Sequence, residues 1–129
     1  MDSKQSRSNK RKGGAWETEI VGDARGRRGY DAERQPKNGS RDSGDVVIRF
    51  PGLHLVVEAK NEKSISLPGY LAELAVEVAN YRKARPSATA AGVVFVKRRQ
   101  YGAAKGYAVM EVDAFYDLLE LLTRGIVER

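Results

Sequence analysis

The stretch DVVIRFPGLHLVVEAK, residues 45–60, decides the fold of this chain. It contains two runs rich in branched apolar residues, 45–50 and 53–60, on either side of Pro51-Gly52. Runs of this length and composition, separated by a Pro-Gly pair, predict two strands joined by a tight connection. We therefore expect an antiparallel hairpin with its turn at Pro51 and Gly52.

The register of this hairpin follows from the turn. If Pro51 and Gly52 form it, Phe50 faces Leu53, and counting back along both strands places Asp45 opposite Glu58. Because side chains alternate between the faces of a strand, one face is wholly apolar and must be core. A loop longer by two residues would shift the pairing but keep the faces, whereas a one-residue bulge would not. The apolar face carries Val46, Ile48, Phe50, Leu53, Leu55, Val57 and Ala59, and the other carries Asp45, Val47, Arg49, His54, Val56, Glu58 and Lys60.

The opposed carboxylates of Asp45 and Glu58 are the first candidate for chemistry. Two like charges directly opposite each other on a sheet repel, and their Cβ atoms would be about 5 Å apart. One divalent cation can bridge carboxylates at that separation through oxygen ligands. Lys60 lies two residues beyond Glu58 on the same face, so its ammonium group comes close to the same point.

A helix expected over residues 15–25 adds a third acid. Trp16, Ile20 and Ala24 recur at helical spacing, and Glu17 shares their apolar side. An acid on an apolar face needs a partner such as a metal ion or a basic side chain. We therefore expect Glu17 to complete a site with the two opposed acids.

Composition limits the other possibilities. The 129 residues suit one domain, and they include no Cys and a single His, His54, which excludes zinc sites built from Cys, disulfides, Cys nucleophiles and two-His metal sites. Oxygen ligands remain, and these suit Mg²⁺, with Mn²⁺ as a substitute. The sequence contains neither an apolar run long enough for a membrane span nor an apolar signal core, so we expect a cytoplasmic protein, or one in the host cytoplasm if it is viral.

The remaining patterns predict an α/β domain over residues 15–129, preceded by a flexible basic arm over residues 1–14. The element order is α-β-β-β-α-β-β-α. The apolar residues of the last helix could pack in the core or against a second subunit. Further elements are expected at residues 30–35 (strand), 67–85 (helix), 92–97 (strand), 106–112 (strand) and from Asp113 onward (helix with Phe115, Leu118, Leu119 and Leu122 on one face).

The net charge of +6 favours a polyanionic partner, with nucleic acid as the first candidate and an anionic membrane surface as the second. Basic residues in exposed segments either contact a phosphate backbone or are simply solvated. The candidates are Lys10, Arg11 and Lys12 in the arm, Lys37 and Arg41 in a polar loop, and Lys97, Arg98 and Arg99 after a buried strand.

The acids and Lys60 together suit phosphodiester hydrolysis. A metal held by Asp45 and Glu58 can polarise a phosphate and lower the pKa of a bound water, and Lys60 can orient that water or neutralise charge. Taken singly, Glu58 and Lys60 could be an ordinary exposed cross-strand pair, and Asp45 could merely cap a turn. The combination with Glu17 favours a catalytic site, to which Glu17 would add a metal ligand or hold metal-bound water.

The same residues resemble a known family. Asp45 followed by Glu58-Ala59-Lys60 matches the D…(D/E)-x-K pattern of the PD-(D/E)XK nuclease superfamily. More closely, the chain resembles the archaeal-type Holliday junction resolvases (the Hjc family), which have phage relatives. The stretch KRKGGAWE, residues 10–17, is similar to their K-R-K-G-x-x-x-E opening, whose Glu is catalytic, and YDAERQPKNGS, residues 30–40, is similar to their first strand and loop.

The resemblance implies a restriction-endonuclease-like fold, with a central mixed five-stranded sheet flanked by helices. It also implies a homodimer that makes Mg²⁺-dependent paired cuts in four-way DNA junctions, as in recombination and repair. Arg34 would contact DNA, and Ser40 would lie near the scissile phosphate. The chain departs from the family at Gly44, where a Pro is usual, and at the helix opening Leu67-Pro68-Gly69, which lacks a common Gln. The alternatives are a nicking or restriction-like nuclease and a non-catalytic nucleic-acid-binding domain.

Overall fold

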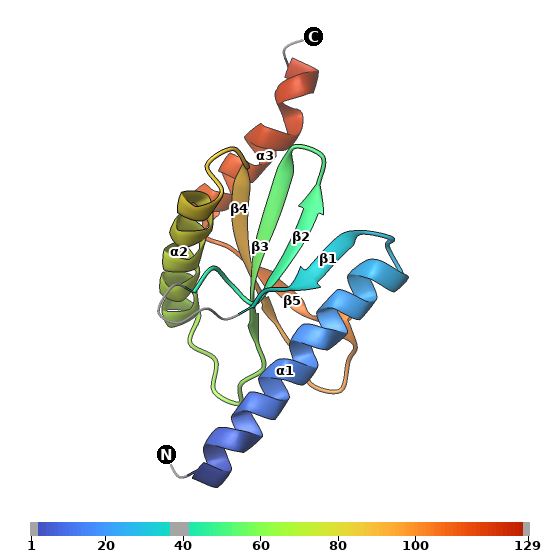
Figure 1. Ribbon diagram of the computed structural model, residues 1–129, viewed down its shortest axis with the longest axis vertical. Helices are drawn as coiled ribbons and strands as arrows, with labels where there is room; N and C mark the ends of the chain where they lie inside the picture. The colour runs from blue at the N-terminus through green and yellow to red at the C-terminus, as the bar shows by residue number, and fades with distance from the viewer. Residues whose placement is uncertain (1–2, 37–41, 128–129) are drawn as a thin grey trace.

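The computed structural model describes the backbone of residues 3–36 and 42–127 and the side chains of residues 13–36 and 42–124. Figure 1 shows the strands at the centre with helices around them. The helices are α1 (Ser3–Gly26), α2 (Leu67–Ala84) and α3 (Val112–Val127), with a short 3-10 turn at Ala103–Lys105. The strands are β1 (Asp31–Arg34), β2 (Val46–Phe50), β3 (Leu53–Lys60), β4 (Ala90–Val96) and β5 (Tyr107–Val109).

The five strands form one sheet in the order β1-β2-β3-β4-β5. Strands β3 and β4 are parallel and are connected through α2, and the other neighbouring strands are antiparallel. A parallel pair needs a long crossover connection, which α2 provides. The sheet is therefore mixed and the domain is α/β, and the predicted order of elements is confirmed.

The β2-β3 hairpin has the predicted register. Phe50 pairs with Leu53 and Val46 pairs with Val57, so the turn consists of Pro51 and Gly52. Gly52 has a φ of +81°, a conformation that glycine adopts without steric cost. The pairing confirms that the side chains of β2 and β3 divide between the two faces as expected.

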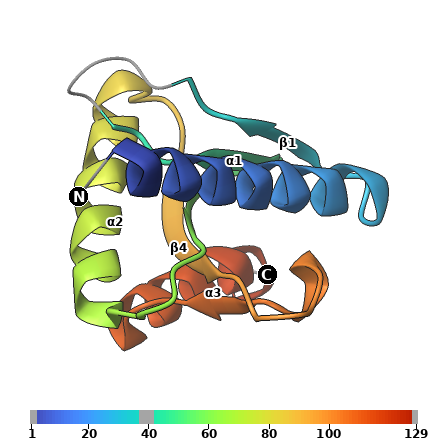
Figure 2. The same cartoon turned by 90° about the horizontal axis from the view of Figure 1, so that it is seen from below.

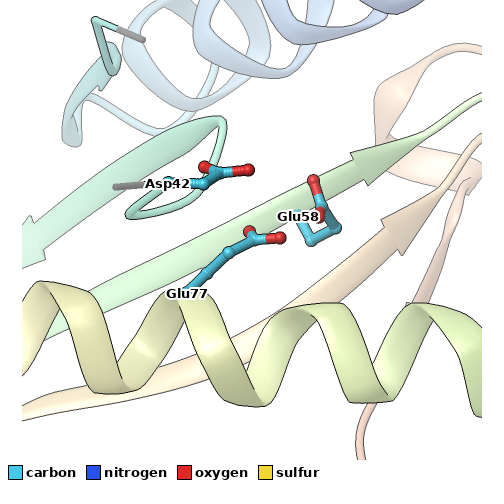
Figure 3. A group of neighbouring side chains, drawn as sticks. All are labelled: Asp42, Glu58 and Glu77. Carbon is cyan, nitrogen blue, oxygen red and sulfur yellow. The ribbon is translucent and has the colours of Figure 1, made fainter. Parts of the chain in front are cut away.

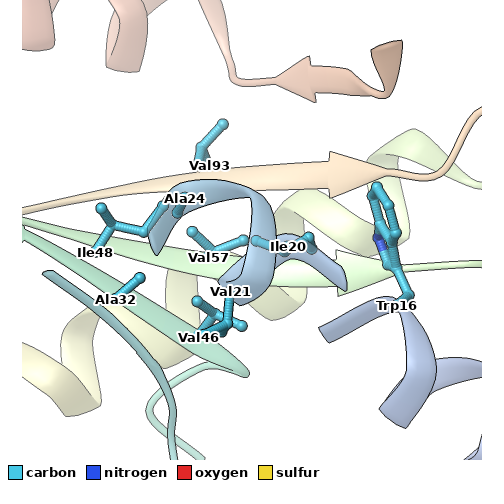
Figure 4. Close-up of a cluster of buried hydrophobic side chains, with 9 residues drawn as sticks. All are labelled: Trp16, Ile20, Val21, Ala24, Ala32, Val46, Ile48, Val57 and Val93. Carbon is cyan, nitrogen blue, oxygen red and sulfur yellow. The ribbon is translucent and has the colours of Figure 1, made fainter. Parts of the chain in front are cut away.

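Both faces of this hairpin are covered. Helix α1 packs on the predicted apolar face through Trp16, Ile20, Val21 and Ala24, and Figure 4 shows these side chains against the strands. Helix α2 covers the opposite face, where Val47 and Val56 are fully buried. Figure 2 shows α1 and α2 as separate layers around the strands. The face that carries the candidate acids is thus a second core, which the sequence did not indicate.

The two terminal helices differ from the sequence-based expectation. Helix α1 begins at Ser3, well before Ala15, so the stretch expected to be a flexible arm is helical over its described part. Its Lys, Arg and Gln residues are good helix formers and no Pro interrupts them, so the turns anchored by Trp16 can extend toward the N-terminus.

Helix α3 packs only in part. Leu118 is half-buried, whereas Phe115, Leu119 and Leu122 are between 41% and 59% exposed. Packing in the core is therefore wrong for these three residues, and contact with a second subunit stays a prediction. In the part of the chain that the structure describes, none of the helices combines the length and the apolar character needed to cross a lipid bilayer.

The close packing of α2 on β4 depends on Gly92. A Cβ atom at this position would lie 2.5 Å from Val78 Cγ2 and 3.0 Å from Leu74 Cδ1. We expect Gly92→Ala to lower the free energy of unfolding by about 1–3 kcal/mol, because the core must shift to accept the methyl group. Urea unfolding measures this change.

The matched control is Gly22→Ala in α1, where a Cβ atom would meet nothing within 4 Å. This change should leave stability unchanged or raise it by up to about 1 kcal/mol, since alanine favours a helix. A Gly92→Ala protein as stable as the wild type would show that α2 and β4 are not packed this closely.

Candidate metal centre

Three carboxylates from separate parts of the chain meet beside β3. Asp42 lies in the segment before β2, Glu58 on β3 and Glu77 on α2, and one oxygen of each lies within 4.8 Å of the other two. Figure 3 shows the three side chains reaching toward one another. Glu58 and Glu77 are only 4% and 3% exposed, whereas Asp42 is exposed. These three residues are called the carboxylate cluster below.

The fold places Glu58 and Glu77 through their neighbours. Glu58 follows the buried Val56 by two residues and so lies on the same side of β3, the side that α2 covers. Glu77 lies on the buried stripe of α2, beside Val78 and between Leu74 and Tyr81. A carboxylate at such a position cannot turn to solvent without unpacking the helix, so both acids are held in the cluster.

Two hydrogen bonds hold Asp42 in place. Its Oδ1 accepts a hydrogen bond from the Gly44 amide at 2.9 Å, and its carbonyl oxygen accepts one from Asn80 Nδ2 at 2.8 Å. Gln35 Nε2 donates to the next carbonyl, that of Ser43, at 2.7 Å. The segment that carries Asp42 is therefore fixed to α2 and to the end of β1.

Asp45 lies beside Glu58, as the register predicts. It is 6% exposed, its amide donates to the Val57 carbonyl at 3.0 Å, and its Oδ2 accepts a hydrogen bond from the Ala59 amide at 2.8 Å. These bonds extend the β2-β3 pairing by one residue and fix the carboxylate across the strand. Asp45 is nevertheless not one of the three cluster residues.

The environment favours the neutral forms of the two buried acids. Burial raises the pKa of Glu58 strongly, and hydrogen bonding to Asp45 and Glu77 and their negative charges raise it further. Burial also raises the pKa of Glu77, to about 7, although a hydrogen bond shared with Glu58 lowers it. The negative charges of Asp42 and Asp45 add to the increase. Without a cation, the site therefore favours protonation of these two acids.

The cluster fits a hard divalent cation. Within the described residues, Glu77 Oε2 is a buried oxygen without a hydrogen-bond partner, and leaving such an atom unsatisfied is costly. Carboxylate oxygens are the donors that Mg²⁺ and Mn²⁺ prefer. A bound cation would satisfy this oxygen and offset the repulsion between the acids, so the residues present suit the metal expected from the sequence.

Lys60 lies on the same strand face, at the edge of the site. Its Nζ is 2.8 Å from Glu73 Oε2 and 5.0 Å from the centre of the Tyr70 ring. Burial lowers the pKa of Lys60, but the hydrogen bond to Glu73 and the negative charges of Glu58 and Glu73 outweigh this and raise it. The ammonium group is therefore charged at neutral pH.

Glu17 lies beside Arg34, and its part in the site stays a prediction. It is buried at 6% exposure, and its Oε2 lies 3.3 Å from Arg34 Nη2. The sequence predicted Asp45, Glu58 and Glu17 as metal ligands, but only Glu58 belongs to the carboxylate cluster. The partner that the buried Glu17 requires is supplied at least in part by Arg34. Contact of Arg34 with DNA stays a prediction.

The basic residues expected to bind nucleic acid are only partly described. Lys37, Ser40 and Arg41 lie outside the described residues, as do the side chains of Lys10, Arg11 and Lys12. In the third group, Lys97 Nζ is 3.3 Å from Glu19 Oε1 and 4.9 Å from the Trp16 ring centre, and Arg98 stacks on Tyr101 at 3.8 Å. Arg99 is exposed. Lys97 therefore ties β4 to α1, and Arg99 is the most accessible cation of this group.

Sequence reasoning missed Asp42 and Glu77. Glu77 could have been found by the argument used for Glu17, because it follows Leu74 by three residues and precedes Tyr81 by four on the apolar stripe of its helix. Asp42 carries no comparable signal, since it lies in a polar loop and reaches the cluster only through contacts with Gly44 and Asn80.

Comparison of the chain with models of known protein families, and with curated proteins, finds no match. The site is therefore interpreted from its own geometry.

The raised pKa of Glu77 predicts how stability depends on pH. In the absence of divalent cations, folded Glu77 keeps its proton up to about pH 7, whereas the unfolded chain releases it near pH 4.5. The stability that this group contributes therefore falls as pH rises from about 4.5 to 7. We expect Glu77→Gln to have a flatter profile, with a difference of about 1–3 kcal/mol at pH 8, because the neutral amide removes the buried charge. Urea unfolding in EDTA across this range measures it.

Glu120→Gln, which changes an exposed acid on α3, serves as the control and should follow the wild-type profile. Mg²⁺ added at pH 8 should raise the stability of the wild type and have a smaller effect on Glu77→Gln, since a ligand that binds only the folded state stabilises it. Equal pH slopes for wild type and Glu77→Gln would contradict the buried charge at this position.

Proposed function

We propose that this chain is a metal-dependent DNA endonuclease that cuts four-way junctions in paired fashion, as a homodimer in the cytoplasm or in the host cytoplasm. The observation that carries the proposal is the carboxylate cluster, with Asp45 and the charged Lys60 beside it. Hydrolysis of a phosphodiester places further negative charge on an anionic phosphate, and this arrangement supplies what that reaction needs.

Each side chain has a distinct part in the proposed reaction. The oxygens of Glu58, Glu77 and Asp42 would hold the divalent cation, with Asp45 fixing the position of Glu58. When bound, Mg²⁺ supplies Lewis acidity to a phosphate oxygen and acidifies water. The Lys60 ammonium, whose raised pKa keeps it protonated, donates hydrogen bonds to the phosphate and offsets the charge that develops during cleavage.

The DNA substrate is proposed from charge and from the sequence pattern. The net charge of +6 draws the chain to polyanions, although it does not choose among them. The D…E-x-K spacing, together with the resemblance of residues 10–17 and 30–40 to junction resolvases, favours branched DNA.

The direct test incubates the protein and Mg²⁺ with a labelled four-way junction and with a linear duplex of the same sequence. Symmetric cuts in the junction alone are expected. Cuts in both substrates would instead indicate a nicking or restriction-like nuclease, and a junction that is bound but uncut would indicate a non-catalytic binding domain.

Asp45→Asn separates catalysis from folding. The Asn oxygen can still accept the hydrogen bond from the Ala59 amide, so the fold and junction binding should persist. Cleavage should fall by at least about 100-fold, the scale observed when one electrostatic group is removed from an active site. Single-turnover cleavage and gel-shift binding measure the two effects.

The control is Asp117→Asn, an exposed acid on α3, which should cleave as the wild type does. Loss of binding and of folding together in Asp45→Asn would show that Asp45 is structural instead.

A further inference from the structure

Lys60 is anchored on the side of α2 rather than left free in solvent. Its side chain is 16% exposed, and its ammonium is 2.8 Å from Glu73 Oε2 and over the ring of Tyr70. Glu73 itself is 53% exposed at the side chain, so nothing in the packing requires a carboxylate there. The contact with Lys60 is therefore the interaction from which a role for Glu73 is inferred.

The aromatic side of this anchor is rigid. Tyr70 is 4% exposed, and its hydroxyl donates to Glu62 Oε1 at 2.6 Å, with the Ser64 carbonyl at 3.2 Å. A ring held at both ends gives the lysine stem a fixed surface, and its face attracts the ammonium. The position of Lys60 is thus defined by two residues of α2.

The same face of α2 serves the carboxylate cluster. Tyr70, Glu73 and Glu77 are spaced by three and four residues, so they form one row along the helix. Glu73 faces Lys60, and one turn later Glu77 faces Glu58 and Asp42. Helix α2 therefore helps to position both the Lys60 ammonium and the carboxylates of the cluster.

The contact with Glu73 keeps the Lys60 ammonium apart from the acids of the carboxylate cluster. Lys60 lies two residues after Glu58 on the same strand face, so the ammonium is within reach of the acids of the carboxylate cluster. Without Glu73, the strongest attraction for the ammonium would be the acids of the cluster, where the desolvated surroundings strengthen ion pairing. An ammonium paired there would occupy the oxygens that a divalent cation needs.

We propose that Glu73 is a positioning residue that holds Lys60 aside from the carboxylate cluster, so that the cation site stays open while the ammonium remains beside it. The inference rests on the proposed metal-dependent function and adds to it a residue outside the ligand set. It distinguishes Glu73 from Glu77, although both are acids on one helix face: Glu77 binds the cation, and Glu73 binds the competitor of the cation.

The test measures Mn²⁺ binding to the whole chain, by electron paramagnetic resonance of the free ion and by calorimetry. Four proteins are compared: wild type, Glu73→Gln, Lys60→Met and the double variant. Glu73→Gln should weaken Mn²⁺ binding about tenfold, the scale for groups that orient metal ligands. Lys60→Met should bind at least as tightly as the wild type, and adding Glu73→Gln to Lys60→Met should change nothing further.

Two controls define the result. Lys63→Met changes an exposed lysine nearby and should leave Mn²⁺ binding unaltered, and urea unfolding in EDTA checks that each variant is folded. Lys60→Met keeps the apolar stem that packs over Tyr70, so its fold should be retained.

The outcomes separate the two proposals. If Glu73→Gln binds Mn²⁺ as the wild type does, or loses the same factor in the Lys60→Met background, Glu73 does not act through Lys60 and this inference is overturned while the nuclease proposal stands. A wild-type chain that neither binds Mn²⁺ nor cuts DNA overturns both.

Discussion

The candidate site depends on one electrostatic constraint, the burial of Glu58 and Glu77 against each other and beside Asp45. Burial raises the pKa of both glutamates and the negative charge of Asp45 adds to both increases, so that a proton or a cation relieves the excess charge. A shared proton satisfies one contact between them but leaves Glu77 Oε2 without a partner in the described structure. A divalent cation bound to the cluster would offset the excess charge and satisfy this oxygen, so the cluster could hold a metal ion.

Helix α2 gives this constraint its geometry. It buries Val47 and Val56 on the sheet face that also carries the acids, so the same packing that forms a second core removes solvent from Glu58. Loss of that packing would expose the carboxylates, lower their pKa toward ordinary values and weaken the reason for a cation to bind. Stability and the proposed chemistry are therefore coupled through α2 more than through α1, which packs on the other face of the sheet.

Local patterns predicted the hairpin well and the site only in part. Pro51-Gly52 and strict alternation determine the register, so Asp45 beside Glu58 followed from the sequence. Glu17 was assigned to the site because its helix face is apolar. That face packs on the side of the sheet opposite α2 and the carboxylate pairs with Arg34, so the part of Glu17 in the site stays a prediction. The same criterion applied to α2 would have found Glu77. Asp42 depends on long-range contacts with Asn80, which no local pattern encodes.

The backbone at Gly44 determines the position of Asp42. Gly44 has a φ of +101°, which proline cannot adopt, and a Cβ atom there would lie 2.7 Å from Val56 Cγ1. The Gly44 amide, which proline lacks, donates to Asp42 Oδ1. Glycine thus allows the chain to turn sharply before β2 and supplies the hydrogen bond that aims Asp42 at the carboxylate cluster. Since a proline here would remove both, Gly44 and the third acid of the cluster are best explained as one feature of this chain.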